Sequence, residues 1–394
     1  MVYFSAVGMV NALGNTLSEV SENLSTGQAP GMAPQQGWLL GDTPIWLGAV
    51  NAKLPPIPEH LLLHNSRNNR LLLAALSQIH SAVSACITRY GASRLAVIMG
   101  TSTSGIFEGE RAVREYQPAA GEEAERFPAG YAYQQQELGD PSIFLSRYLG
   151  LTGPSYTVST ACSSSVRAII SGKRLIDAGI VDAAIVGGAD SLCRMPINGF
   201  HSLESLSAQR CTPFAAERKG INVGEAAALI LLSREPAPVA LLGVGESSDA
   251  WHMSAPHPEG HGAEQAIRMA LGQAGMQPAD VGYINLHGTA TRLNDQIESL
   301  VVNRVFGHQT PCSSTKHLTG HTLGAAGATE AALSWLMLSH ALPLPVQDFS
   351  QGAWDTTLAK INLVTGPAKL GAPVILSNSF AFGGNNACLI LGAC

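Results

Sequence analysis

Cys162 lies in VSTACSSSVRAI (158–169), where a strand-like run gives way to a helix-like one. Its neighbours are small, so the backbone can turn sharply and a substrate can approach the thiol closely. The next run, SSSVRAIISGKRLIDAG, is typical of a helix, which places Cys162 at a helix N-terminus. The helix dipole and free amides favour the reactive thiolate there. A free cysteine is also often a buried small residue, so this segment alone predicts either a nucleophile or a core position.

Two histidines occupy similar positions later in the chain. His287 ends the strand-like run GYINLHG and opens the loop HGTATRLND, while His321 lies in STKHLTGHTLGAAGA, ahead of an Ala-rich helix. Sites in α/β folds gather where strand ends and loops face helices. Either histidine alone could be a core residue, but both together with Cys162 indicate a functional site.

The elements that must position these residues alternate between apolar runs and helix-like stretches. Continuous apolar runs suit strands covered on both faces; they are RLAVIMG at 94, DAAIVGG at 182, EAAALILLS at 225, GYINLHG at 282, PVILSNSF at 373 and ACLILG at 387. Stretches with helical spacing lie between them, such as 70–87 and 262–276, with Gly275 as a helix C-terminal residue. The pattern predicts an α/β protein.

Two pairs of segments suggest an internal duplication. AVIMGTST (96–103) resembles YINLHGTAT (283–291), and GEAAALILLS (224–233) resembles GGNNACLILG (383–392). The boundary would fall near SREPAPVA, where prolines interrupt a strand pattern. We therefore expect two halves, 1–238 with the cysteine and 239–394 with both histidines, although chance similarity of small apolar stretches is the alternative.

Composition excludes several classes of protein. The 394 residues are 46% hydrophobic and 13% charged, enough for a large buried core, and the net charge of −6 argues against nucleic-acid binding. The seven cysteines are scattered and form no CxxC pair, which argues against disulfides and zinc. The histidine-rich loop HMSAPHPEGH lacks familiar ligand spacing, so no metal is predicted. Without a leader or a long apolar run, we expect a cytoplasmic protein with no membrane span.

Longer motifs are spread almost end to end. They are SAVGMVNALGNTLSEVSENLSTG near the start, followed by TACSSS, GGADSL, PFAAERKGINVGEAAALIL, DAWHMSAPHPEG, HGTATRLND, STKHLTGHTLGAAGATEAAL and NSFAFGGNN. Several are long enough to be specific. By these motifs the sequence resembles the β-ketoacyl-acyl carrier protein synthases, the elongating condensing enzymes of the thiolase superfamily.

The resemblance implies a role for each candidate residue. Cys162 is the acylated nucleophile, His287 and His321 are the catalytic pair, and Lys316 and Glu330 support them. A thiolate exchanges readily with an acyl thioester and keeps the acyl group reactive. Two neutral imidazoles can donate hydrogen bonds to the carbonyl of malonyl-carrier protein and stabilise the enolate that forms as carbon dioxide leaves.

The resemblance also assigns the oxyanion donors and a gate. The amides of Cys162 and Phe382 form the oxyanion hole, and the Phe382 ring gates the acyl pocket. This sequence departs from the family pattern with Ala381 where a glycine commonly precedes the gating phenylalanine, and with Asn385 where threonine is usual. A methyl group at position 381 is expected to restrict the gate.

Substrate and partner contacts follow in the same way. Thr289 and Thr291 alternate along HGTAT and present hydroxyls on one side, suited to the amides of pantetheine, although they could simply cap a turn. Arg67 and Arg70 lie on one helical face and match a segment that docks the acidic carrier protein. No cofactor is expected, because the substrates are carried on the phosphopantetheine of acyl carrier protein.

The implied fold is α/β and thiolase-like, with five layers αβαβα built from two duplicated halves. The family dimerises near the nucleophile, so we expect a homodimer or a heterodimer with a related chain. Divergent positions in PFAAERKGINVGEAAA favour a specialised pathway, such as type II polyketide or aryl polyene synthesis, over housekeeping fatty-acid synthesis.

Three other interpretations are weaker. A biosynthetic thiolase needs a late cysteine in a CxG setting, which neither Cys388 nor Cys394 has, and an initiating synthase would have asparagine in place of His321. A non-catalytic chain-length partner generally lacks the nucleophile, whereas this chain retains Cys162 and both histidines. That last alternative stays open.

Overall fold

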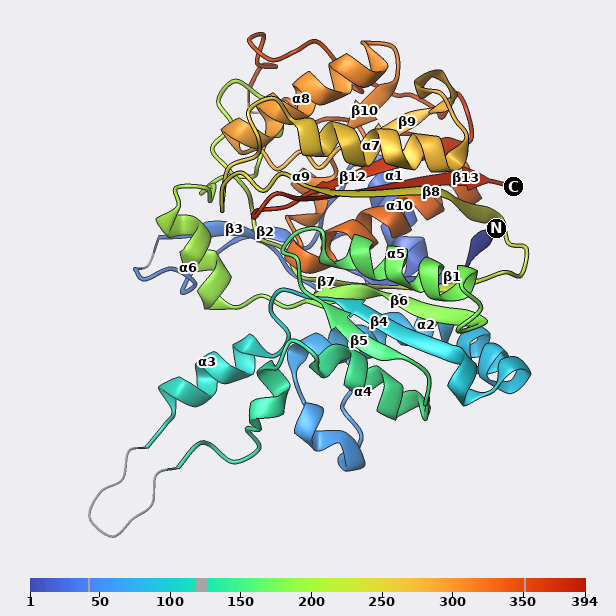
Figure 1. Ribbon diagram of the computed structural model, residues 1–394. Helices are drawn as coiled ribbons and strands as arrows, with labels where there is room; N and C mark the ends of the chain where they lie inside the picture. Colours follow the sequence, from blue (N-terminus) through green and yellow to red (C-terminus); the bar gives the residue numbers. More distant parts are fainter. Residues whose placement is uncertain (42, 118–125, 351) are drawn as a thin grey trace.

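The computed structural model describes residues 1–41, 43–117, 126–350 and 352–394. Figure 1 shows five layers, in which helices α7 and α8 cover one layer of strands, α5 and α10 fill the centre, and α2 and α4 cover the other layer. The central helices pack against both layers, since α10 contacts β7 on one side and β12 on the other. The predicted αβαβα arrangement is confirmed.

The strands of the first half run in the order β5-β4-β6-β7-β1. Within this half, β4 is parallel to β5 and β6, and β7 is antiparallel to β6 and β1. Their bounds are β1 (Val2–Val10), β4 (Leu95–Gly100), β5 (Ser155–Val158), β6 (Ala183–Asp190) and β7 (Ala226–Ser233).

The second half repeats this topology in the order β10-β9-β12-β13-β8, with β11 added beside β10. The bounds are β8 (Val239–Ser248), β9 (Tyr283–Asn285), β10 (Pro311–Ser313), β11 (Asn362–Leu363), β12 (Val374–Phe380) and β13 (Asn385–Ala393). When the five shared strands of each half are numbered 1 to 5 along the chain, leaving out β2, β3 and β11, both halves have the order 3-2-4-5-1. In both, the fifth strand is antiparallel to its neighbours. The similar sequence segments fall on equivalent strands, β4 with β9 and β7 with β13.

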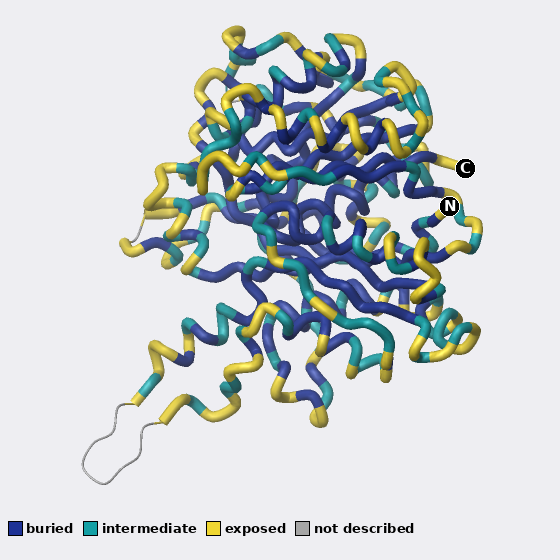
Figure 2. Tube along the Cα trace, viewed as in Figure 1, coloured by how far each residue is buried: buried dark blue, intermediate teal, exposed yellow. Residues whose placement is uncertain are grey.

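The two halves meet at a short seam. Strand β1 pairs with β8 through Val2 with Leu241 and Tyr3 with Ala240, so the described strands of both halves form one eleven-stranded sheet that folds into two layers. A separate antiparallel hairpin of β2 (Met32–Gln35) and β3 (Ile45–Gly48) lies at the left of the view in Figure 1. Figure 2 shows the strands and central helices as the buried part of the chain.

The helices complete the layers. Their bounds are α1 (Leu17–Thr26), α2 (Arg67–Tyr90), α3 (Ile106–Arg114), α4 (Asp140–Leu149), α5 (Ser164–Asp177), α6 (Arg194–Ser202), α7 (His261–Ala274), α8 (Arg292–Phe306), α9 (Lys316–Thr319) and α10 (Ala326–His340). Helix α10 is buried almost all round, as an apolar central helix must be. A Cβ on its Gly327 would lie 2.1 Å from Val166 of α5, so the two central helices touch closely. That contact brings the segments that carry Cys162 and His321 together.

Among the described residues, α2 is the one helix that is long and apolar enough to cross a membrane, which corrects the expectation that the chain has no long apolar run. Its most apolar window has a mean hydropathy of 1.6, so by length and composition it could cross a membrane. The helix packs its apolar face on β1 and β7 and contributes Leu72, Leu76 and Ile79 to a buried cluster. The high hydropathy of α2 is therefore explained by the packing of its apolar face in the core of this fold.

Candidate active site

Cys162 lies in the tight turn between β5 and α5. The preceding Ala161 has a φ of 53°, a left-handed conformation that is costly for a residue with a side chain. The amide of Thr160 donates to the Ser164 hydroxyl at 2.9 Å, which ties the turn to the first residue of α5. The turn holds the Cys162 side chain, 6% exposed, at the N-terminal end of that helix, as predicted.

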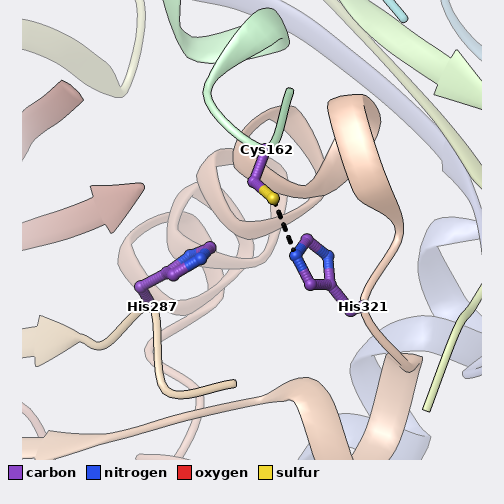
Figure 3. A group of neighbouring side chains, drawn as sticks. All are labelled: Cys162, His287 and His321. Atoms are coloured by element: carbon purple, nitrogen blue, oxygen red, sulfur yellow. Dashed lines mark hydrogen bonds between the residues drawn. The ribbon is translucent and has the colours of Figure 1, made fainter. Parts of the chain in front are cut away.

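His321 lies directly beside the thiol. Its Nε2 atom is 3.0 Å from Cys162 Sγ (Figure 3). Its Nδ1 atom accepts a hydrogen bond from the Leu323 amide at 3.1 Å. Because Nδ1 acts as an acceptor, the neutral ring carries its proton on Nε2. His321 therefore presents an N–H donor to the space above the thiol.

His287 presents the same tautomer by a different route. The Lys316 ammonium lies 3.3 Å from His287 Nδ1 and donates to the His287 carbonyl oxygen at 2.5 Å and to Glu330 Oε1 at 2.5 Å. A cation that donates to Nδ1 leaves the ring proton on Nε2. The two imidazole rings are perpendicular, with centroids 5.5 Å apart, and both flank the thiol (Figure 3).

Electrostatics keep both imidazoles neutral. Burial lowers the pKa of His287 and of His321 well below 6.5, and the nearby Lys316 charge lowers both further. A neutral ring with its proton on Nε2 donates without carrying a charge of its own. The site thus holds two preorganised donors aimed at one small space.

The thiol itself differs from the sequence-based expectation. Burial raises the pKa of Cys162 to about 11, outweighing the Lys316 charge and the amides of Cys162 and Phe382, which act in the other direction. The expected thiolate is therefore wrong for this state, because the desolvation cost exceeds the effect of the helix N-terminus. At neutral pH the Cys162 side chain is therefore a neutral thiol in this state.

The Phe382 loop closes one side of the site. The amides of Phe382 and Cys162 both approach the Cys162 sulfur, and the Phe382 ring centroid lies 5.7 Å from that of Phe200. Two backbone hydrogen bonds hold Ala381 in the turn. Its amide donates to the Asn385 carbonyl oxygen at 2.9 Å, and its carbonyl oxygen accepts from the Gly384 amide at 3.0 Å. The left-handed positions are Gly383 and Gly384, so the backbone at 381 does not require glycine here.

A cavity of about 330 Å³ leads to these groups. Cys162, His287, His321 and Phe382 line it, together with Thr289 and Thr291. The two threonine hydroxyls are 2.9 Å apart, so they do share one side of the chain. The cavity is therefore lined by a thiol, two imidazole donors and a pair of hydroxyls.

Comparisons with known proteins identify the family. Residues 50–237 match the N-terminal domain of β-ketoacyl synthase, and residues 239–350 match its C-terminal domain. Nodulation protein E of Rhizobium meliloti (strain 1021) is 31% identical over 359 residues, 87% of each chain. The chain belongs to the β-ketoacyl synthase family. A 3-oxoacyl-[acyl-carrier-protein] synthase 2 of the same strain is 40% identical over 261 residues, 61% of each chain, and the enzyme class of this synthase is acyltransferase.

Two solved structures are close to this synthase along its whole length. One is a ketosynthase (ApeO) in complex with its chain length factor (ApeC) from Xenorhabdus doucetiae, with 60% identity, a TM-score of 0.95 and coverage of 100% of this chain and 98% of that chain. The other is the ishigamide ketosynthase/chain length factor, with 25% identity, a TM-score of 0.88 and coverage of 100% and 99%.

The sequence did not reveal one positioning residue of the synthase. Glu298 on α8 accepts the His287 amide on Oε1 and the Gly288 amide on Oε2, each at 2.7 Å, and Asn378 also donates to it at 3.1 Å. Burial raises the pKa of Glu298 to about 7. The signal in the sequence that could have identified Glu298 is its place beside the apolar Ile297, on the buried face of a helix.

The trio at the centre of the synthase site resembles a metal site in composition. Cys162, His287 and His321 offer ligand atoms within 4.8 Å of one another. A ligating nitrogen must offer its lone pair, which would move the ring proton to Nδ1. In both rings, however, Nδ1 faces a donor, the Leu323 amide or the Lys316 ammonium. The tautomers fit a carbonyl acceptor better than a cation.

The two arginines predicted to dock a carrier protein lie elsewhere on the synthase. Arg67 donates to both carboxylate oxygens of Glu225, and Arg70 donates to Asn65 Oδ1 at 3.1 and 2.9 Å. Both line a second cavity, of about 700 Å³, that Cys162 does not line. Docking at these positions stays a prediction.

Proposed function

We propose that this synthase extends an acyl group on Cys162 by decarboxylative Claisen condensation with malonyl-acyl carrier protein, giving 3-oxoacyl-acyl carrier protein. The observation that carries the proposal is the Cys162 thiol 3.0 Å from His321 Nε2, with His287 completing a pair of neutral N–H donors. A nucleophile and two donors around one small space are the groups that this reaction requires.

In the first step, Cys162 takes the acyl group from its carrier. Sγ forms a bond to the thioester carbonyl carbon, and the bond from that carbon to the pantetheine sulfur breaks. The amides of Cys162 and Phe382 stabilise the oxyanion between these events. The thiol proton ends on the departing pantetheine sulfur, so the step is balanced without a separate base.

In the second step, malonyl-carrier protein loses carbon dioxide. The thioester carbonyl oxygen accepts hydrogen bonds from His287 and His321, and the electron pair of the breaking carbon–carboxylate bond becomes the enolate. Thr289 and Thr291 line the same cavity and hold the pantetheine amides. Because the donors are in place before charge develops, they stabilise the transition state more than the ground state.

In the third step, the enolate carbon attacks the thioester carbonyl on Cys162. The tetrahedral oxyanion collapses, the bond to Sγ breaks, and the new carbon–carbon bond remains in the 3-oxoacyl product. The thiolate takes one proton from solvent, which returns the high-pKa thiol of the resting site. Lys316 and Glu330 keep His287 in its donor tautomer throughout.

The other candidate functions have less support. Cys388 is buried in β13 and Cys394 is exposed at the end of the chain, and neither lines the site cavity as a thiolase acid would. A chain-length partner would not need Cys162 held against His321. The full-length similarity to a ketosynthase solved with a chain length factor supports the specialised polyketide or aryl polyene branch, an acyl carrier protein as substrate carrier, and a heterodimer with a related chain.

Removal of the thiol should separate the two half-reactions. Cys162→Ala should abolish self-acylation and condensation but retain malonyl decarboxylation, because the enolate donors on His287 and His321 remain. Release of carbon dioxide from labelled malonyl-carrier protein measures this directly. A folded Cys162→Ala protein that cannot decarboxylate, beside a His287→Ala protein that can, would contradict the assigned roles.

Decarboxylation should also tolerate mild acid. The imidazoles act as neutral donors, and a histidine whose pKa is lowered below 6.5 remains neutral to lower pH. The rate of malonyl-pantetheine decarboxylation by Cys162→Ala should therefore hold between about pH 7.5 and about pH 6. A rate that titrates away with an ordinary histidine pKa would show that the rings are solvated in the working enzyme.

A further inference from the structure

The backbone of His321 is held from both sides by one segment, residues 222–225. The His321 amide donates to the Asn222 carbonyl oxygen at 2.6 Å, and the Gly224 amide donates to the His321 carbonyl oxygen at 2.9 Å. These bonds pair the segment with the loop between α9 and α10. The position of the His321 ring above Cys162 therefore depends on where this segment lies.

The segment and the loop are in direct backbone contact. A Cβ on Gly224 would lie 2.3 Å from the Thr319 carbonyl oxygen, so no side chain fits between them. Gly320 lies on the other side of this contact in a left-handed conformation, with a φ of 70°. A displacement of residues 222–225 would therefore displace the His321 backbone by a similar distance.

Glu225 ends this segment and anchors it. Its side chain is 1% exposed and accepts the Val50 amide at 3.0 Å and the Leu192 amide at 3.2 Å. The Arg67 guanidinium spans both carboxylate oxygens, with Nε 2.8 Å from Oε2 and Nη2 2.5 Å from Oε1. Such bidentate pairs fix geometry as well as charge. Arg67 thus fixes the position of the Glu225 carboxylate, and Glu225 ends the segment 222–225 that is hydrogen-bonded to the His321 backbone.

We propose that Arg67 is a positioning residue for His321 and acts through Glu225. The proposal rests on the proposed function, in which the His321 imidazole donates to the malonyl thioester. It gives Arg67 a role besides docking, because its guanidinium already binds the buried Glu225 carboxylate through Nε and Nη2. It gives the Arg67–Glu225 pair a role in the decarboxylation rate itself.

The expected effect is specific to one half-reaction. Arg67→Met leaves the Glu225 carboxylate buried without its cation, which favours a rearrangement of the segment. A misplacement of about 1 Å at a catalytic group can cost about a hundredfold in rate. We therefore expect decarboxylation to fall about 10- to 100-fold, while acylation of Cys162, which is positioned by α5, changes little.

The experiment removes the carrier protein from the assay. Malonyl-pantetheine decarboxylation is measured for the full chain, with its partner chain if it purifies as a heterodimer, in the Cys162→Ala background. Arg67→Met, Glu225→Gln and the double variant are compared with Arg111→Met. Arg111 lines the same cavity as Arg67 but pairs with Glu115 instead of Glu225, so it is the matched control. Self-acylation from an acyl-pantetheine donor is measured separately with Cys162 intact, and decarboxylation of malonyl-carrier protein is measured in parallel for comparison.

The proposal predicts that Arg67→Met and Glu225→Gln lower kcat on malonyl-pantetheine, that the double variant is no worse than either, and that Arg111→Met is normal. If Arg67→Met does not fold, the double variant, which has no unpaired buried charge, carries the test. A defect seen only with malonyl-carrier protein would make Arg67 a docking residue, and equal losses in both half-reactions would make the pair merely structural. His321→Ala in the same assay reports separately on the proposed function.

Discussion

His321→Ala should lower the rate of malonyl decarboxylation about a hundred- to a thousandfold, or about 3 to 4 kcal/mol in barrier, the usual cost of losing one preorganised donor. The reason is geometric, because Leu323 donates to Nδ1 and fixes the ring proton on Nε2 in the space beside Cys162. Self-acylation should persist, since its oxyanion is held by backbone amides. Release of labelled carbon dioxide and the mass of the acyl-enzyme measure the two activities in parallel.

His308→Ala is the control for this variant, because His308 is exposed and does not line the site cavity. It should match the wild type in both assays. A His321→Ala protein that decarboxylates normally but cannot be acylated would reverse the roles, making His321 the partner of the thiol instead of the enolate donor.

Lys316→Met should harm both stability and rate. Lys316 and Glu330 form an ion pair at 2.5 Å with both side chains buried, and removing one partner of such a pair costs about 3 to 5 kcal/mol. Burial already raises the pKa of Glu330, and the Lys316 charge is what opposes that rise. Without the ammonium, His287 also loses the donor that fixes its tautomer. Thermal unfolding and the decarboxylation rate should both fall.

Lys316→Met/Glu330→Gln separates the two effects. The double variant leaves no unpaired buried charge, so we expect it to recover most of the lost stability. It should not recover the rate, because nothing then donates to His287 Nδ1 and the ring can adopt the other tautomer. Recovery of both stability and rate would show that Lys316 is only structural.

The places of Cys162, His287 and His321 at the ends of strands and loops could be predicted from the sequence, because each residue lies in a local pattern of small residues or an apolar run. The small residues around Cys162 indicated a tight turn before a helix, and the structure adds that Ala161 adopts the strained conformation there. The continuous apolar runs predicted strands β4, β6 and β7 because strands covered on both faces need no polar alternation. The repeated topology could be predicted because the equivalent strands β4 and β9, and β7 and β13, have similar sequences.

The ionisation state and the supporting residues could not be predicted in the same way. The pKa of Cys162 depends on how deeply the turn is buried between the two halves, which no local pattern reports. Glu298 and Arg67 act across long separations in the chain: Glu298 holds the His287 amide, and Arg67 reaches Glu225. Their roles arise from packing, so a sequence motif shows them only as a helical carboxylate and a surface arginine.

The most direct test is the intact mass of the protein after incubation with a panel of acyl-carrier proteins, with and without candidate partner chains. Wild type should gain a single acyl group and Cys162→Ala should gain none, and the preferred acyl group would begin to define the pathway. An adduct of equal size on Cys162→Ala, or no adduct with any donor even when partners are present, would contradict Cys162 as the nucleophile and favour a non-catalytic chain-length partner.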